Sequence, residues 1–500
     1  MLAKNIIANI FGKFWVLAIS ILAVPIYINL LGVEAYGLVG FFTMLLATLH
    51  LLEFGLGVVV NREIAQTRGD KEKFQNTLDL IRSLEAIYWM VGLLLGLLVY
   101  FSASFLATQW LNNELLAVAD IENAIKLMAM ITAFQWPISL YAGCLLGLER
   151  QVLLNFLQVC FGTLRAGGAI LVLWLISPTL KAFFIWQLLT SVLTVLGFAI
   201  LCWRVLPHRQ QLARFSVSSL RSVFHFGAGV GATSIATFLL SNLDRVVLSK
   251  TVTLTAFGYY NVANQINVST RMISGAVFQA LFPRFSSLYA NKKDQELVDL
   301  FHRGSQLISF VVFPAAITLA LFSEQILYIW LRNELVAHSA AMIASFLVLG
   351  SALNATLGLP FELTVARGWS MYGFYQNMVT AIVQVPIMLM LVTIYGALGA
   401  AIAWLILNIG YFFVAAPIMI LKTLPKGELS IWYTEDVIKP LVVTVLVSVI
   451  MRMGLPESGS FWGLFFWIVG SWITAQLACF LVLPRMRLLM SNRFGTLWSH

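Results

Sequence analysis

Residues 8–42 read ANIFGKFWVLAISILAVPIYINLLGVEAYGLVGFF, and no charged side chain lies between Lys13 and Glu34. A helix needs roughly 20 predominantly apolar residues to cross a bilayer, and this run supplies them. A secretory signal peptide would end in a small-residue cleavage site, and none follows here. We therefore expect the run to stay in the protein as its first membrane span.

The chain as a whole has the composition of a membrane protein. Of its 500 residues, 60% are hydrophobic and 11% are charged, whereas about a quarter of the residues in soluble domains are charged. This excludes a soluble globular protein and makes the lipid bilayer the main partner. The net charge of +9 reflects basic cytoplasmic loops, so no nucleic-acid partner is expected.

Apolar windows predict an all-α polytopic protein with about fourteen transmembrane helices. With the N-terminus in the cytoplasm, most of the 31 lysines and arginines fall in cytoplasmic loops, so the positive-inside rule places both termini there. No loop of this map is long enough for a catalytic domain. The expected spans are 8–31, 36–60, 84–106, 125–146, 153–176, 182–203, 223–248, 256–281, 305–329, 340–364, 370–394, 396–421, 437–453 and 461–483.

The chain also repeats itself at an offset of about 220 residues, which is typical of parallel internal repeats in transporters. The sequence therefore predicts two homologous six-helix lobes around a central cavity, residues 1–210 and 211–422. Residues 423–500 add two helices and a cytoplasmic tail. The matching positions are Ala35, Tyr36 and Gly37 with Ala256, Phe257 and Gly258, Arg62 with Arg284, Arg82 with Arg303, and Gly147 with Gly368.

Polar side chains inside the predicted spans indicate the function, because each charge at mid-membrane costs roughly 2.5–3.5 kcal/mol. In span 153–176, Asn155, Gln158, Gly162 and Arg165 recur at a spacing that we interpret as one helical face. Span 256–281 repeats that spacing. A polar, cationic cavity would favour an anionic cargo. Its candidate substrate-binding residues are Arg165, Arg271, Arg245, Lys13, Asn264 and Asn267.

Three further residues are candidates for ion coupling, namely Glu53, His50 and Asp244. Protonation of a His–Glu pair in a membrane can drive transport. The alternative is a structural hydrogen-bonded pair, and Asp244 can likewise simply pair with Arg245.

Arginines at the predicted cytoplasmic helix ends allow two interpretations. Membrane topology alone accounts for them, whereas a vestibule that attracts phosphate groups is the functional interpretation. The candidate vestibule residues are Arg62, Arg284 and Arg150.

The sequence contains no catalytic signature. There is no glycine-rich phosphate loop followed by Lys and Ser or Thr. The six histidines lack metal-ligand spacing, and the four cysteines lie in apolar runs. We therefore predict no cofactor, no metal site and no enzymatic activity.

Several segments resemble the polysaccharide transporter family, the O-antigen or repeat-unit flippases of the multidrug/oligosaccharidyl-lipid/polysaccharide exporter superfamily. The resemblance covers about residues 1–420, and the fourteen-helix layout matches as well. The segments that carry it are residues 8–42, LLEFGLGVVVNREIA (51–65), LLGLERQVLLN (145–155), SNLDRVVLSK (241–250), AFGYYNVANQ (256–265) and YGALGAAIAW (395–404).

The resemblance implies a flippase of the bacterial inner membrane. Its cargo would be an undecaprenyl-diphosphate-linked oligosaccharide carried to the periplasmic leaflet for O-antigen, capsule or exopolysaccharide synthesis, and its partners would include the polysaccharide polymerase machinery. H⁺ or Na⁺ would be the coupling ion. The family's cationic lumen would be represented by Arg165, Arg245 and Arg271, and Glu53 stands where relatives more often have Asp.

Two other functions stay open from the sequence. One is a drug or organic-cation antiporter of the same superfamily, which would need an acidic cavity rather than a cationic one. The other is a membrane polymerase of lipid-linked sugars, which usually has a long periplasmic loop that this map lacks.

Overall fold

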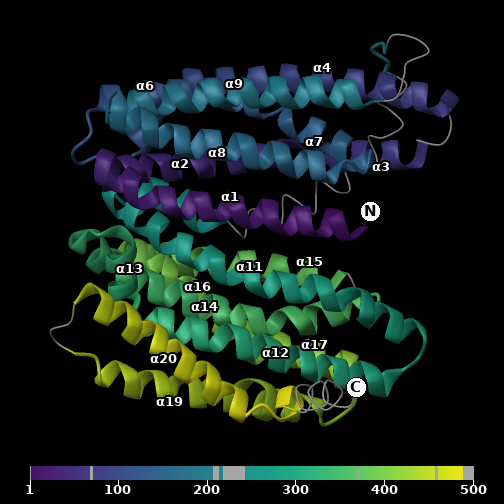
Figure 1. The fold of residues 1–500 in the computed structure, drawn as a ribbon, viewed down its shortest axis with the longest axis vertical. Helices are drawn as coiled ribbons and strands as arrows, with labels where there is room; N and C mark the ends of the chain where they lie inside the picture. The colour runs from purple at the N-terminus through teal and green to yellow at the C-terminus, as the bar shows by residue number, and fades with distance from the viewer. Residues whose placement is uncertain are drawn as a thin grey trace. The chain divides into compact units, whose positions relative to one another are not determined.

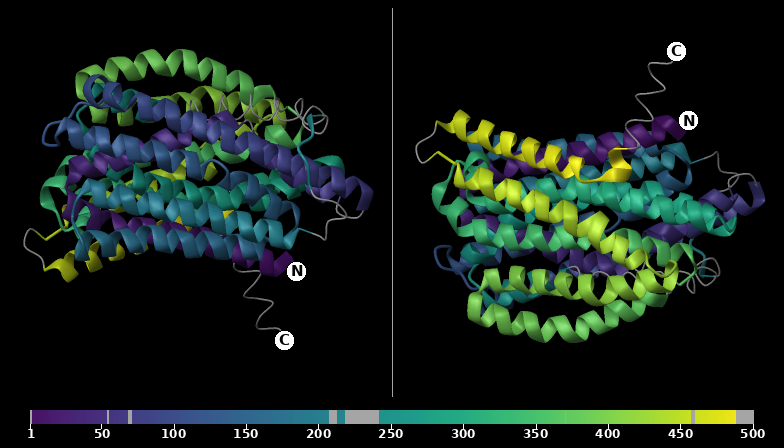
Figure 2. Two further views of the ribbon diagram at one scale, coloured as in Figure 1. Left: turned by 90° about the horizontal axis from the view of Figure 1, so that it is seen from above. Right: turned by 90° about the horizontal axis from the view of Figure 1, so that it is seen from below.

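The computed structural model describes residues 2–53, 55–67, 71–206, 213–217, 242–369, 371–456 and 460–487. These residues divide into two compact units, Met1–Gly258 and Tyr259–His500. Within each unit, long helices run alongside one another (Figures 1 and 2). In the described ranges, eleven helical segments are long and apolar enough to cross a membrane. The predicted all-α polytopic architecture is confirmed.

The first unit is built from helices that pack in pairs. Helix α1 lies along α8, α4 along α6, α3 along α7, and α6 along α9. Figure 1 shows α1 next to α8. The elements are α1 (Leu2–Leu31), α2 (Val33–His50), α3 (Leu56–Thr67), α4 (Lys71–Phe101), α5 (Ala103–Phe105), α6 (Val118–Gln135), α7 (Ile138–Gly147), α8 (Gln151–Leu175) and α9 (Leu180–Val205).

The second unit places α14 against α12, α13 and α16, and α19 against α20, while α12 contacts both α19 and α20. Helix α11 (Leu254–Ala290) begins in the first unit and continues into the second. The other elements are α12 (Asp294–Leu321), α13 (Ser323–Leu331), α14 (Glu334–Ala366), α15 (Met371–Tyr395), α16 (Ala397–Gly410), α17 (Ala416–Thr423), α18 (Glu428–Ile431), α19 (Lys439–Met453) and α20 (Phe461–Leu481).

Two predicted spans are interrupted rather than continuous. The span predicted at 36–60 ends as α2 at His50, passes through a short turn at Leu51–Glu53, and restarts at Leu56. Gly55 has a φ of +68°, which glycine adopts without steric cost. The span predicted at 125–146 breaks between Gln135 and Ile138, because Pro137 has no N–H to continue the hydrogen-bond ladder.

The span predicted at 396–421 contains a π-helical turn at Tyr411–Ala415, and another such turn, Trp432–Ile438, leads into the span predicted at 437–453. Such turns often occur at functional or strained places in helices. The span predicted at 223–248 lies mostly outside the described residues, and only 242–250 are seen as helix. The predicted lobe boundaries at 210 and 422 stay predictions.

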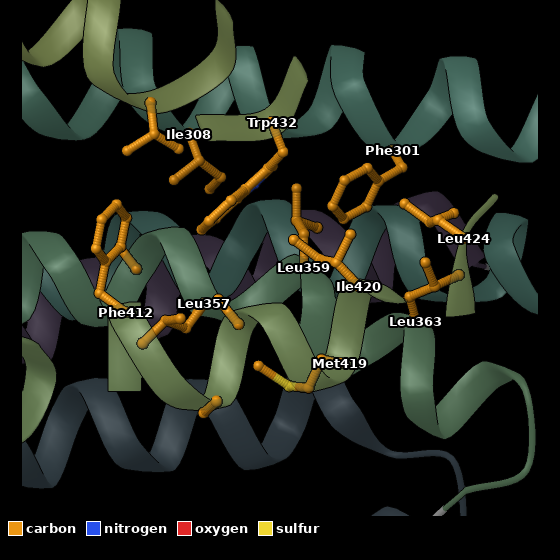
Figure 3. Close-up of a cluster of buried hydrophobic side chains, with 14 of the residues drawn as sticks. Phe301, Ile308, Leu357, Leu359, Leu363, Phe412, Met419, Ile420, Leu424 and Trp432 are labelled. Atoms are coloured by element: carbon orange, nitrogen blue, oxygen red, sulfur yellow. The ribbon is translucent and has the colours of Figure 1, made fainter. Parts of the chain in front are cut away.

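The hydrophobic core of the second unit is centred on Trp432, which is fully buried (Figure 3). Its ring packs 5.6 Å from that of Phe412, centroid to centroid. Phe301 of α12 and Ile420 of α17 belong to the same cluster. Helices within a bilayer gain little from water exclusion, so such close packing is what holds them together.

Glu34 fixes the loop that follows residue 110 in the first unit. Its buried carboxylate accepts hydrogen bonds from three successive backbone N–H groups, those of Glu114 (2.7 Å), Leu115 (2.8 Å) and Leu116 (3.1 Å). Charge-assisted hydrogen bonds of this kind are about twice as strong as neutral ones. Glu34 therefore has a structural role.

The starts of α2 and α11 touch at two glycines. A Cβ on Gly37 would lie 2.1 Å from the Leu254 carbonyl oxygen, and one on Gly258 would lie 2.4 Å from the Val33 carbonyl oxygen. Small residues let helix backbones approach this closely. These are the two glycines that the repeat pairs with each other.

Candidate functional site

Arg165 lies inside the first unit among uncharged side chains. Its Nε donates to Oε1 of Gln187 on α9 at 2.6 Å. With the Gln135 amide turned to suit its neighbours, the oxygen accepts from Arg165 Nη1 at 3.2 Å and Nη2 at 2.5 Å. Amide orientation is assigned from the hydrogen-bond network. In the described ranges, the guanidinium is thus held by two glutamine amides from α6 and α9.

The polar face predicted for α8 is shared between two interfaces. Asn155 is buried against α1, where its Nδ2 donates to Oδ1 of Asn9 at 2.5 Å, and Asn9 donates to Gln151 Oε1 at 3.1 Å. Arg165 instead turns toward α9. Ten residues separate the two side chains by about 15 Å along the helix axis and about 80° around it, so they lie on one broad face but contact different helices.

Helix α11 carries the second predicted group. Asn264 and Asn267 are buried and adjacent, since Asn267 Nδ2 donates to Asn264 Oδ1 at 3.3 Å. The side chain of Arg271 is exposed within the second unit. The two arginines that the sequence treats as equivalent thus differ, because Arg165 is partly buried and bonded to two glutamine amides, whereas the Arg271 side chain is exposed.

The structure shows fewer contacts for the remaining substrate-binding candidates, Arg245 and Lys13. Arg245 is partly buried in the 242–250 helix and lies close enough to Tyr36 to interact electrostatically with it. Asp244 is next to it and partly buried. Lys13 belongs to α1, but its side chain lies outside the described residues.

His50 and Glu53 form the pair that the sequence predicts, with His50 Nδ1 3.5 Å from Glu53 Oε2. The hydroxyl of Tyr88 on α4 donates to Glu53 Oε1 at 2.8 Å. His50 stacks on Trp136, with the ring planes 8° apart. The pair therefore lies where α2 ends, next to the break between α6 and α7. The Glu53 side chain is 15% exposed.

The sequence analysis missed a second carboxylate site, at Glu85 on α4. This side chain is buried, accepts from the Tyr141 hydroxyl at 2.6 Å and from Trp203 Nε1 at 3.1 Å, and pairs with Arg82 at 2.5 Å. Its position one residue inside a predicted span was the available signal. Its three partners indicate a structural role for this carboxylate.

The vestibule candidates lie at helix ends within each unit. Arg62 and Arg150 are exposed, and they share one end of the first unit because Gly147 packs against the Asn61 carbonyl oxygen. In the second unit, Arg284 Nη2 is 3.6 Å from Glu296 Oε2, with both side chains at least half exposed. Exposed pairs of this kind contribute little to stability, about 0–1 kcal/mol.

A pocket of about 440 Å³ opens between α15 and the α16–α17 segment of the second unit. Its lining is mainly apolar, and the Tyr411 and Thr380 hydroxyls meet there at 2.5 Å. None of the predicted site residues lines it. In the part of the chain that the structure describes, no group of three His, Cys, Asp or Glu side chains is arranged to hold a metal ion.

Membrane transporters of known structure share this fold. Lipid II flippase MurJ, in an inward closed conformation, superposes with a TM-score of 0.69 at 14% identity over 95% of this chain and 98% of that one. An inward-facing multidrug resistance MATE transporter of the MOP superfamily gives a TM-score of 0.59 at 17% identity over 81% and 94%. At such identities the likeness concerns the fold.

The chain belongs to the polysaccharide biosynthesis protein family, which matches residues 28–336. The putative O-antigen transporter of Shigella flexneri is 24% identical over 402 residues, 80% of this chain and 93% of that protein. The probable low-salt glycan biosynthesis flippase Agl15 of Haloferax volcanii is 22% identical over 413 residues, 80% and 79%. The polysaccharide transporter family predicted from the sequence is confirmed.

Proposed function

We propose that the protein is a flippase that carries undecaprenyl-diphosphate-linked oligosaccharide repeat units from the cytoplasmic to the periplasmic leaflet of a bacterial inner membrane, for surface polysaccharide synthesis. It works by alternating access through a cationic cavity. The observation that carries the proposal is Arg165, a guanidinium within membrane-spanning helices whose described partners are the amides of Gln187 and Gln135.

A diphosphate needs such a group in order to cross hydrocarbon. Moving one carboxylate-sized ion into a medium of low dielectric costs of order 20 kcal/mol before relaxation, so the path must supply opposite charge. Arginine binds phosphate oxygens through two parallel N–H groups. Since Arg165 is held by neutral amides, it gives up hydrogen bonds worth about 1 kcal/mol each rather than a charge pair when phosphate arrives.

Arg271 supports a second binding position for the same head group. Its side chain is exposed on α11, one to two turns from Asn264 and Asn267. The asparagine amides offer donors to sugar hydroxyls or phosphate oxygens. We assign Arg165 and Arg271 to the phosphates and the asparagines to the adjoining sugar, with Arg245 and Lys13 adding positive charge.

The His50–Glu53 pair is the proposed coupling site. It combines an imidazole with a shielded carboxylate, and protonation of such a pair within a membrane can drive transport. A proton or Na⁺ exchanged at Glu53 would change the charge where α2 ends at a turn, next to the break between α6 and α7. Asp244 is the alternative position for this role.

The test uses purified protein in liposomes, with a lipid-diphosphate oligosaccharide in one leaflet and a glycosidase that reaches only the other. Wild-type protein is expected to expose the sugar to the enzyme. Arg165→Ala and Arg271→Ala should each lower the rate tenfold or more, since a lost charge-assisted contact of about 1.5–3 kcal/mol corresponds to at least that factor.

Arg303→Ala is the matched control, because Arg303 is exposed and paired with Asp299 at 2.6 Å. It should transport at the wild-type rate. Unchanged rates in both the Arg165 and Arg271 variants would contradict the cationic path. No protein-dependent movement in folded protein, together with efflux of a cationic dye that requires Glu53, would instead indicate the antiporter.

A further inference from the structure

His302 on α12 is a fully buried histidine held between two carboxylates of the second unit. Its Nδ1 lies 2.5 Å from Asp436 Oδ2, and its Nε2 lies 2.9 Å from Glu428 Oε2. The side chains of His302 and Asp436 are both 0% exposed, and that of Glu428 is 20% exposed. Nothing in the proposed transport path involves these residues.

Asp436 is fixed by further contacts from α12. Gln306 Nε2 donates to Asp436 Oδ1 at 3.0 Å, and the Ser309 hydroxyl donates to the Asp436 carbonyl oxygen at 2.5 Å. The Gln306 oxygen accepts from the backbone N–H of Arg485 at 3.1 Å. The carboxylate is therefore held rigidly in place against the imidazole.

The two hydrogen bonds of His302 set how many protons it shares with Asp436 and Glu428. A neutral imidazole has one N–H, and its other nitrogen can only accept, while an ionised carboxylate has no hydrogen to donate. Both ring nitrogens of His302 face carboxylate oxygens. A neutral imidazole and two ionised carboxylates therefore need one additional proton before both hydrogen bonds can form.

We propose that His302, Asp436 and Glu428 form a proton-binding site in which His302 is held as an imidazolium that bridges the two carboxylates. The bound proton fastens the segment Glu428–Ile438, and with it the C-terminal helices α19 and α20, to α12. The proposal is independent of the transport function. A metal ion is not the ligand, since no described His, Cys, Asp or Glu triplet suits one.

The charges around the site fit this assignment. From the C-terminal segment, Arg485 interacts electrostatically with Asp436, so an imidazolium and one guanidinium face two carboxylates. Other charged groups on these elements have partners elsewhere: Arg303 pairs with Asp299, Lys439 with Glu435, Asp294 with Arg367, and Glu296 with Lys293, while Arg452 lies over the Phe322 ring.

Further contacts show what the site holds in place. Gln476 Nε2 of α20 donates to the Phe310 carbonyl oxygen of α12 at 2.8 Å, and the Cys479 thiol lies 3.9 Å from the Ser309 carbonyl oxygen. Both contacts are about two turns along α12 from His302. After losing the proton, the ring could donate to only one of the two carboxylates, and the other would lose its partner, which weakens this interface.

The first test measures thermal unfolding of the full protein in detergent between pH 6 and pH 9. A free histidine releases its proton near pH 6.5, whereas the folded protein is expected to retain it. The folded state then binds more protons than the unfolded state, so stability is present below about pH 6.5 and falls as pH rises. The wild-type Tm should drop across this range by a few degrees more than that of His302→Gln.

His338→Gln is the matched control, because His338 is 76% exposed and pairs with Glu324 at 2.7 Å. It should keep the wild-type slope. Glu428→Gln, which removes the outer carboxylate only, provides a milder variant if His302→Gln does not fold, and it should also flatten the slope. A slope equal to wild type in whichever of these two variants folds would overturn the proposal.

The second test does not depend on substituting His302 or Glu428. With ¹⁵N-labelled histidine, one of the six histidines should keep both ring nitrogens protonated at pH 8, and its resonance should be unaffected by His338→Gln. If every histidine has an unprotonated ring nitrogen at pH 8, the proposal is overturned.

Discussion

Gly37 and Gly258 pack reciprocally: Gly37 lies against the backbone of Leu254 and Gly258 against the backbone of Val33, and neither position has room for a side chain. The distances from a Cβ at these positions, 2.1 Å to the Leu254 oxygen and 2.4 Å to the Val33 oxygen, involve backbone atoms that cannot rotate away. The sequence analysis pairs the same two glycines in its predicted internal repeat.

Replacing either glycine with alanine should therefore destabilise the protein. We expect Gly37→Ala and Gly258→Ala each to cost about 1–3 kcal/mol, the usual range for overpacking, visible as a lower Tm in detergent. Gly470→Ala on α20 is the control, because a Cβ there meets no atom within 4 Å. Equal Tm values for all three variants would refute the close approach.

Substitutions of Gln187 test whether Arg165 needs an uncharged hydrogen-bond partner. Gln187→Glu would place a carboxylate 2.6 Å from the Arg165 Nε, and the resulting ion pair should lower the rate of lipid-linked sugar movement more than Gln187→Leu does. The liposome assay measures both, with the exposed substitution Gln109→Glu as a charge control. Faster transport in Gln187→Glu than in Gln187→Leu would argue against phosphate binding at Arg165.

Glu53 should be needed for coupling rather than for movement as such. Glu53→Gln keeps the acceptor for the Tyr88 hydroxyl at 2.8 Å but removes the exchangeable charge. We expect flipping down a concentration gradient to persist and its stimulation by an imposed pH or Na⁺ gradient to disappear. Glu122→Gln, which breaks a pair with Lys126, should retain the stimulation. A stimulated Glu53→Gln protein would move the coupling role to Asp244.

Glu34 should matter for stability alone. Glu34→Gln leaves at most one amide oxygen for the three N–H groups of residues 114–116, and unsatisfied buried donors cost about 1–3 kcal/mol. The Tm should fall while the transport rate per folded molecule stays unchanged. Glu114→Gln, on the exposed loop itself, serves as the neutral comparison. A normal Tm would show that the loop is held by other contacts.

The spans could be predicted from apolar periodicity because membrane crossing depends on length and hydropathy, which are local properties. The interruption after His50 was not predicted, although Gly55, whose φ is +68°, was the available signal. The π-helical turn at Trp432–Ile438 was not predicted either, and the burial of Trp432 depends on contacts with residues such as Phe412 that the sequence alone does not place.

The candidate site was predictable in its residue types but not in its partners. Arg165 stood out because a charge in an apolar span is rare, yet Gln187 and Gln135 lie on other helices. His302 and Asp436 are separated by 134 positions, and only folding brings them together. Spacing along one helix also could not show that Asn155 contacts α1 while Arg165 contacts α9.

The contacts that α12 makes with residues far later in the chain set an order for biosynthesis. Gln306 bonds to Asp436 and to the backbone of Arg485, and Trp432 fills the surrounding core. A ribosome must therefore deliver the last helices before α12 can reach its final packing, whereas the first unit has all of its residues by Gly258. During synthesis α12 is in the membrane before the partners of His302 are made, and α2 of the first unit likewise precedes Leu254, its partner at Gly37, so both units depend on helices that are completed late.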